Sequence, residues 1–112
     1  ERAWALPYLK GRAYFASRCS PGHYNHEDYT ALHLLGKTLR YTVDLSGVGC
    51  RCAASLYLVP MRKNPMPSQC SDFYCDAGSS CGVPCDQITV QQANLRTWSS
   101  NIHLSSDPAG AK

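Results

Sequence analysis

Apolar and polar residues alternate along the middle of the chain, and this pattern predicts β-strands. In the run "KTLRYTVDLSG", the odd-numbered residues from Leu39 to Leu45 are apolar and the even-numbered residues from Thr38 to Asp44 are polar. A period of two gives a strand one buried and one solvated face. The next run, "AASLYLVPM", is apolar on both faces, which is typical of a strand covered on both sides. The short glycine-containing link between the two runs predicts an antiparallel pair.

The sequence after this pair predicts one more strand. Residues 62–84 hold three prolines, two glycines and three cysteines, a composition that predicts a cross-linked loop. Ile88 and Val90 then mark a strand whose other face is polar. The segment "QQANLRTW" is compatible with the start of a helical turn, and we expect residues 105–112 to form a fraying tail.

The length and the cysteine content predict a small domain stabilised by disulfides. A chain of 112 residues buries only about two-thirds of the surface that its unfolded form exposes, so its core is modest. Seven cysteines at this length predict a disulfide-bonded protein of an extracytosolic oxidising compartment, whether secreted, wall-bound or lumenal. Metal binding is the alternative, but the cysteine spacings lack the paired C-x2-C of zinc sites. Because seven is odd, one thiol has no partner within this sequence.

The charge and the remaining motifs point away from several classes of function. Eleven basic and eight acidic residues give a net charge of +3, and the scattered basic residues form no patch that would follow a nucleic-acid backbone. No apolar run reaches the roughly 18 residues of a membrane span. His23 and His26, beside Glu27 and Asp28, suggest a metal site, but such short polar clusters are usually turns. We therefore predict no cofactor and no metal.

Three later segments carry a more specific signal. They are "YTVDLSGVGCRCAASLYLVPM", "FYCDAGSSCGVPC" and "CDQITVQQANLRTWSSNIH". The last resembles a catalytic strand of the form E-x-D-x-x-E-A-N followed by a histidine, with Ala93, Asn94 and His103 at the matching offsets. Over residues 34–103 the chain resembles glycoside hydrolase family 7, the cellulases and cellobiohydrolases, and most of all its protist-type members.

The resemblance implies a fold that this chain contains only in part. The family's catalytic domain is a sandwich of two antiparallel sheets, jelly-roll-like and several times longer than 112 residues. We therefore expect residues 1–112 to form a single truncated module: mostly β, with antiparallel sheets in a partial β-sandwich that disulfides stabilise. Much of the far wall of the family's cleft is missing from such a module.

The resemblance also implies that catalysis has been lost. Family members hydrolyse with retention, using a carboxylate nucleophile, a carboxylic acid/base and an intervening Asp. These roles fall on Gln87, Gln92 and Thr89, respectively. An amide cannot form the glycosyl ester and has no proton to deliver near neutral pH, so we predict a pseudoenzyme. Residual endoglucanase or cellobiohydrolase activity through Asp76 or Asp86 is the weaker alternative.

The spacing of these positions raises a geometric question. Gln87 and Thr89 share a face by alternation, but Gln92 should face the opposite way. The family needs all three in its cleft, so its strand is expected to carry a bulge before the third position. If this chain keeps the bulge, Gln92 lines the same surface, and if the strand is straight, Gln91 replaces it.

Several polar and aromatic side chains are candidates for carbohydrate binding. Four of them also have a structural alternative: Gln87 and Gln92, together with Thr89, as the polar face of a half-buried strand, Trp98 as a core residue and His103 as an exposed loop histidine. The candidates are Gln87, Gln92, Asn94, Trp98 and His103.

The resemblance further implies a disulfide between Cys75 and Cys85, which would hold the catalytic strand. Cys52 and Cys70 form a second candidate pair, and the partner of Cys19 is left open between Cys81 and Cys50. In the family, the cysteine that matches Cys50 bonds to a segment absent here, so Cys50 is predicted to be the odd thiol.

Two roles follow from these observations. The leading prediction is a catalytically inactive module with a structural or β-1,4-glucan-binding role. The alternative is an accessory structural subunit packed into a larger protein assembly, because a partial sandwich leaves a sheet face and strand edges uncovered.

Overall fold

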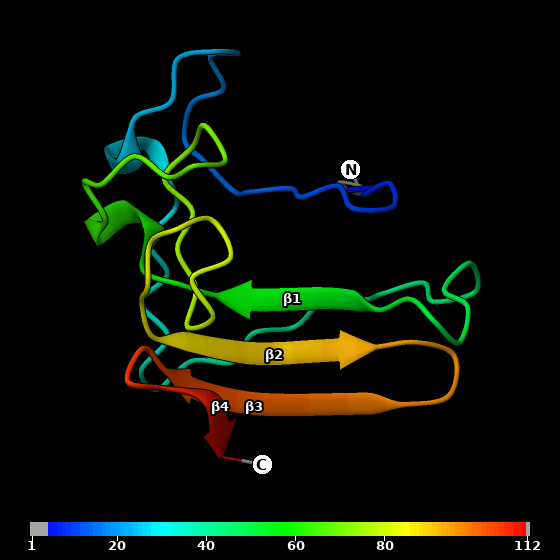
Figure 1. The fold of residues 1–112 in the computed structure, drawn as a ribbon. Coiled ribbons are helices and arrows are strands. Elements are labelled where there is room, and N and C mark those ends of the chain that lie inside the picture. Colours follow the sequence, from blue (N-terminus) through cyan, green and yellow to red (C-terminus); the bar gives the residue numbers. More distant parts are fainter. Residues whose placement is uncertain (1–4, 112) are drawn as a thin grey trace.

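The computed structural model describes residues 5–111 and shows a mostly β chain built on one open antiparallel sheet (Figure 1). The sheet has four strands in the order β1-β2-β3-β4, and two single-turn 3-10 helices lie in the loops. The helices are η1 (His26–Asp28) and η2 (Met61–Lys63), and the strands are β1 (Ala54–Leu58), β2 (Gln87–Ala93), β3 (Trp98–Leu104) and β4 (Asp107–Ala111).

The register of β2 contains a β-bulge at Val90. Against β1, Thr89 pairs with Tyr57 whereas Gln91 pairs with Leu56, so Val90 has no partner of its own. The pairing with β3 shifts in the same place, between Thr89 and Gln92. One additional residue in a strand reverses the alternation of the side chains beyond it.

Because cross-strand partners share a face, the register assigns each side chain to one of two faces. We call them the polar face and the apolar face. The polar face consists of Ser55, Tyr57, Gln87, Thr89, Gln92, Ser99, Asn101 and His103. The apolar face includes Ala54, Leu56, Leu58, Ile88, Gln91, Ala93, Trp98, Ile102 and Leu104.

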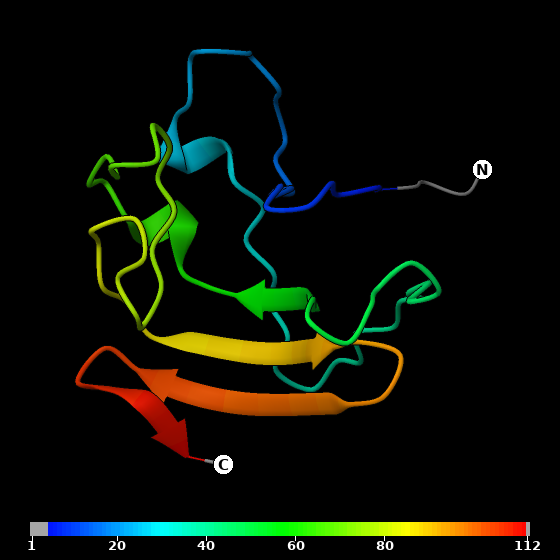
Figure 2. The ribbon, with the colours of Figure 1, turned by 45° about the vertical axis from the view of Figure 1, so that its right-hand side comes forward.

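The hydrophobic core lies among the loops beside β1 and not between two sheets. It is formed by Tyr29, Met61, Tyr74 and Cys81, with Tyr14, Val59 and Phe73 packed against them. Figure 2 shows these loops gathered at the end of the sheet where β1 finishes and β2 begins. No second sheet faces the first within residues 5–111, so the structure shows the antiparallel sheet of the prediction without its sandwich.

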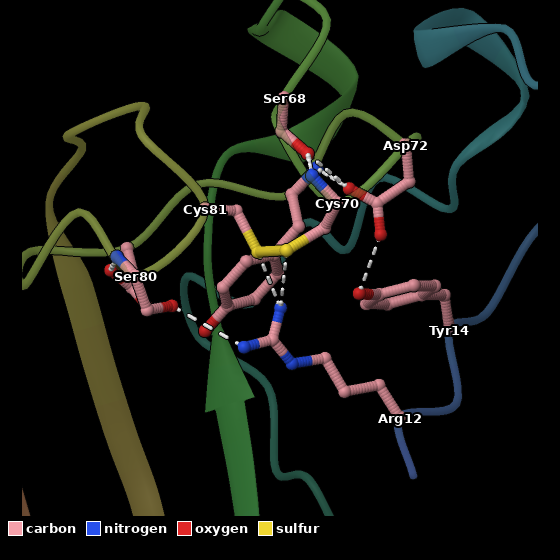
Figure 3. Close-up of a disulfide and its surroundings, with 9 residues drawn as sticks. Arg12, Tyr14, Ser68, Cys70, Asp72, Ser80 and Cys81 are labelled. Atoms are coloured by element: carbon pink, nitrogen blue, oxygen red, sulfur yellow. Dashed lines mark hydrogen bonds between the residues drawn. A yellow bond between two sulfur atoms is a disulfide. The ribbon is translucent and has the colours of Figure 1, made fainter. Parts of the chain in front are cut away.

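The N-terminal segment is fastened to this core by two side chains. The guanidinium of Arg12 lies 4.2 Å from the ring centroid of Tyr74, and its Nη1 donates to the Sγ of Cys81 at 2.8 Å (Figure 3). The hydroxyl of Tyr14 donates to Asp72 at 2.9 Å. Burial, with this hydrogen bond, raises the pKa of Tyr14 to about 12, so the phenol stays protonated and remains a donor.

Two disulfides close the loop between η2 and β2. The predicted bond between Cys75 and Cys85 is confirmed, but the predicted pair Cys52–Cys70 is wrong, because Cys70 bonds to Cys81. Cys70 lies in a loop that folds back on itself, whereas Cys52 precedes β1 at the opposite end of that strand (Figure 1). The two bonds indicate an oxidising compartment.

Three cysteines are free, where the sequence predicted one. Cys50 is among them, as expected, together with Cys19 and Cys52, and all three are exposed. The pairing that the sequence left open for Cys19, with Cys81 or Cys50, is therefore not formed.

The strand predictions are confirmed only in part. β1 and β2 form where the apolar runs predicted them, but residues 38–45 join no strand, so the predicted antiparallel pair is wrong: β1 takes the distant β2 as its partner. The helical turn in "QQANLRTW" is also wrong, since a four-residue turn connects β2 to β3 there. The predicted tail instead contains β4, and Ser105 is tied to Asp86 by hydrogen bonds at 2.9 and 3.1 Å.

Ala16 and Tyr29 form an isolated antiparallel bridge in the N-terminal region. None of the helices described over residues 5–111 has the length and apolar character needed to traverse a bilayer.

Asp76 organises the loop that leads into β2. Its side chain accepts hydrogen bonds from the backbone N–H of Ser80, at 2.8 Å, and from the hydroxyl of Ser80. Its backbone carbonyl accepts from Cys85 at 3.0 Å. Burial raises the pKa of this carboxyl, but the hydrogen bonds from Ser80 and Tyr74 and the charge of Arg12 outweigh burial, and the net pKa is lowered.

We expect Asp76→Asn to lower the free energy of unfolding by about 1 kcal/mol at pH 7. The folded pKa of Asp76 lies below that of the unfolded chain, so its contribution is present above about pH 4 and is lost as the pH falls through the folded pKa. Urea unfolding between pH 7 and pH 2.5 should show the difference from wild type shrinking toward acid. The exposed Asp107, changed to Asn, is the control; a difference that stays constant with pH contradicts the prediction.

Candidate functional site

The β-bulge brings the three degenerate catalytic positions onto one surface. Gln87, Thr89 and Gln92 all lie on the polar face, as expected for a strand that keeps the bulge. The Nε2 of Gln87 donates to the Oγ1 of Thr89 at 2.9 Å. Gln91 does not replace Gln92: it is buried on the opposite face, where its Nε2 donates to the carbonyl of Ala54 at 3.1 Å.

Strand β3 adds a second line of polar side chains to this surface. In the β2–β3 register, each degenerate position has a polar partner. We call the six residues the polar row. It consists of the pairs Gln87 with His103, Thr89 with Asn101, and Gln92 with Ser99. Of these, Asn101 and Ser99 were not predicted, although both alternate with His103 at a period of two along the sequence.

The polar row is exposed at its Gln92 end, buried at Thr89 in its middle and half-buried at its other end. Thr89 is only 1% exposed, and Gln87, Asn101 and His103 are half-buried. Gln92 is exposed, and the neighbouring residues of β1 on the same face, Ser55 and Tyr57, are exposed as well. A ligand therefore has direct access to the row at the Gln92 end.

His103 is oriented by the strand that follows it. Its Nδ1 lies 3.0 Å from the carbonyl oxygen of Pro108 in β4. Because a carbonyl can only accept, the Nδ1 carries the proton in this contact. In the neutral ring the Nε2 is then a hydrogen-bond acceptor.

Two of the carbohydrate-binding candidates lie away from the polar row. The Oδ1 of Asn94 accepts from the backbone N–H groups of Arg96 and Thr97, at 2.8 and 3.1 Å, and from the hydroxyl of Thr97. Asn94 therefore holds the turn between β2 and β3. Trp98 pairs with Ala93 on the apolar face, so the structure does not bring it together with Gln87, Gln92 and His103.

The polar row contains no carboxylate. Its groups are amides, hydroxyls and one imidazole, which exchange hydrogen bonds but supply neither a carboxylate nucleophile nor a carboxylic acid. The nearby carboxylates make hydrogen bonds that hold the adjoining loops: Asp86 accepts hydrogen bonds from Ser105, and Asp76 accepts a hydrogen bond from Ser80. This arrangement suits the binding of a ligand rich in hydroxyl groups.

His26, one of the residues that suggested a metal site beside η1, contacts other groups of the protein. The Nδ1 of His26 lies 2.8 Å from the carbonyl of Arg62, and its ring packs on Phe73. Over the part of the chain that the structure describes, no three His, Cys, Asp or Glu side chains are grouped so that they could hold a metal ion.

The apolar face of the sheet is only partly covered. Four of its large side chains are between 46% and 60% exposed, and part of the face forms a hollow that Leu32 and Leu34 also line. Such an area of exposed apolar side chains is typical of an interaction surface. The four residues are Ile88, Trp98, Ile102 and Leu104.

Comparisons with models of protein families, with curated proteins and with solved structures each found no match to this chain. The polar row and the apolar face are therefore interpreted from their own chemistry.

We expect Asn94→Ala to lower the free energy of unfolding by about 1–2 kcal/mol, because three donors in the β2–β3 turn lose their acceptor. Asn94→Asp keeps an acceptor oxygen and is the matched control. Urea unfolding measures the free energy of unfolding of both variants. If the two variants are equally destabilised, the turn does not depend on this acceptor.

Proposed function

We propose that this protein is a catalytically inactive relative of glycoside hydrolase family 7 that binds a β-1,4-glucan along its polar row. The observation that carries the proposal is the β-bulge at Val90, which puts Gln87, Thr89 and Gln92 on one face. The family resemblance predicts a bulge before the third catalytic position, Gln92. Without a carboxylate in the row, the same surface is suited to holding a sugar chain and not to cutting it.

The chemistry of the row supports a carbohydrate ligand. Amide and hydroxyl groups pair with sugar hydroxyls as both donors and acceptors, and the Nε2 of His103 adds an acceptor. Tyr57, exposed on the same face, supplies an aromatic side chain opposite Thr89. A few polar groups placed on a rigid sheet favour a specific orientation of the ligand.

The fold fits the same proposal. We propose that the sheet is one of the two sheets of the family's sandwich, with the polar face on the cleft side and the apolar face on the side that meets the second sheet. The partly covered apolar face supports this assignment, because a half of a sandwich leaves such a face open. The two disulfides support an extracytosolic location, where a glucan is accessible.

We expect the protein to bind cellohexaose, and Gln92→Ala to raise the dissociation constant by about tenfold, since a hydrogen-bonding group at the open end of the row is lost. Isothermal titration calorimetry measures the effect. Trp98→Ala is the control, because Trp98 lies on the apolar face. Binding that Trp98→Ala abolishes and Gln92→Ala leaves unchanged would contradict the polar row as the site.

We also expect no hydrolysis of cello-oligosaccharides or aryl cellobiosides by the wild-type protein. Chromatography of the products after long incubation measures this, with Asp76→Asn and Asp86→Asn as controls for contaminating activity. Cellobiose release that either substitution removes, while the variant remains folded, would show that the chain is an enzyme using another carboxylate.

A second candidate role is that of a structural subunit in a larger protein assembly. The observation in its favour is the partly covered apolar face, where Ile102 is 60% exposed. Burial of these side chains against another chain would add the hydrophobic stabilisation that the small core lacks. Size-exclusion chromatography of the isolated protein tests it: a monodisperse monomer at every concentration argues against this role.

A further inference from the structure

Residues 38–44, which we call the unpaired segment, have the pattern of a β-strand but no partner. The side chains alternate between apolar and polar, yet none of these residues makes a backbone–backbone hydrogen bond within the described part of the chain. The chain turns immediately before and after the segment, with hydrogen bonds from Lys37 to Leu34 and from Val48 to Leu45. Backbone donors and acceptors of this kind favour pairing with another strand.

The unpaired segment lies over the apolar face of the sheet. Both ribbon views show it passing behind β1 and β2, and Leu32 and Leu34, just before it, line the hollow on that face (Figures 1 and 2). Leu39, Tyr41 and Val43 are 36–40% exposed, so a large part of each is covered. The segment therefore lies where a second sheet layer would begin.

We propose that the unpaired segment forms an antiparallel pair with the same segment of a second copy of this chain, with the two-fold axis at Thr42. The proposal gives a partner to the subunit role described above and is independent of glucan binding, which concerns the opposite face. Isologous pairing of one strand with its own copy closes a dimer and leaves no further copy to recruit at that edge.

The sequence of the segment is complementary to itself in this register. With Thr42 opposite Thr42 of the second copy, Arg40 lies opposite Asp44, and Asp44 opposite Arg40. On the other face, Tyr41 meets Val43, and Leu39 meets Leu45. Opposite charges and apolar pairs directly across an antiparallel ladder stabilise it.

Neighbouring registers lose this complementarity. A shift by one residue places apolar side chains opposite polar ones, so that each face of the pair becomes a mixture of the two. A shift by two residues places Arg40 opposite Thr42 or Ser46, so the two charge pairs are lost. In the monomer, the Oδ1 of Asp44 accepts from the N–H of Ser46 at 2.9 Å, which leaves the other carboxylate oxygen for an arginine.

The first test is the solution mass of charge variants, measured by sedimentation equilibrium over a range of concentrations. We expect a wild-type dimer whose dissociation constant rises about tenfold in Arg40→Asp and in Asp44→Arg, since each change puts like charges opposite each other twice. The double variant Arg40→Asp/Asp44→Arg restores opposite charges and should regain the wild-type value. Arg51→Asp, an exposed charge change outside the segment, is the control.

The second test is disulfide cross-linking in a protein whose free Cys19, Cys50 and Cys52 are changed to Ser. Thr42→Cys places two thiols opposite each other at the axis, where the Cα–Cα separation of about 4.5–5.5 Å suits a disulfide. We expect a covalent dimer on addition of oxidised glutathione, which takes up the two electrons released and is reduced to two thiols. Thr38→Cys, opposite Ser46 in this register, is the matched control and should not cross-link.

A wild-type chain that stays monomeric at every concentration overturns the proposal. So does a dimer that is indifferent to the charge of Arg40 and Asp44, or one in which Thr38→Cys cross-links as readily as Thr42→Cys. The last two results would leave a subunit role standing through another surface. Loss of glucan binding has no bearing on any of these outcomes.

Discussion

The β-bulge at Val90 is the constraint on which the two faces of the sheet depend. Before it, β2 presents Gln87 and Thr89 to one side, and after it the alternation is reversed, so Gln92 joins them and Gln91 is buried opposite. Strand β3 follows the same register, which adds His103 and Asn101 to the polar face. A straight strand would exchange the two amides, placing Gln91 beside Gln87 and Thr89 and sending Gln92 to the apolar face.

The position of β2 is in turn fixed by what precedes it. Cys85 is bonded to the buried Cys75 two residues before the strand begins, and Asp76 joins the loop to Cys85 through its backbone. The hydrophobic core is also on this side, among the loops. The stable part of the molecule therefore lies at one end of the sheet, and β2 extends from it with β1 and β3 on either side.

The sequence predicted those parts of the fold whose signals are local. The apolar runs located β1 and β2, and the family resemblance implied both the Cys75–Cys85 bond and the bulge. Strands β3 and β4 were missed for physical reasons: Ser100 interrupts the apolar alternation of β3, and β4 contains Pro108 and Gly110, residue types that are depleted in strands. Residues 38–45 are the opposite case, a predicted strand that does not form. Alternation predicts the ability to form a strand but not the presence of a partner strand.

Of the candidate site, the sequence predicted the residues of β2 and His103 but not Ser99 and Asn101 on β3. The pairing of side chains across strands depends on the strand register, which one amino-acid sequence does not specify. The contact between Arg12 and the sulfur of Cys81 has a consequence of another kind. That sulfur is held in place by its bond to Cys70. The attachment of the N-terminal segment is thus coupled to the redox state of a loop almost sixty residues away in sequence, and a reducing medium would loosen both together.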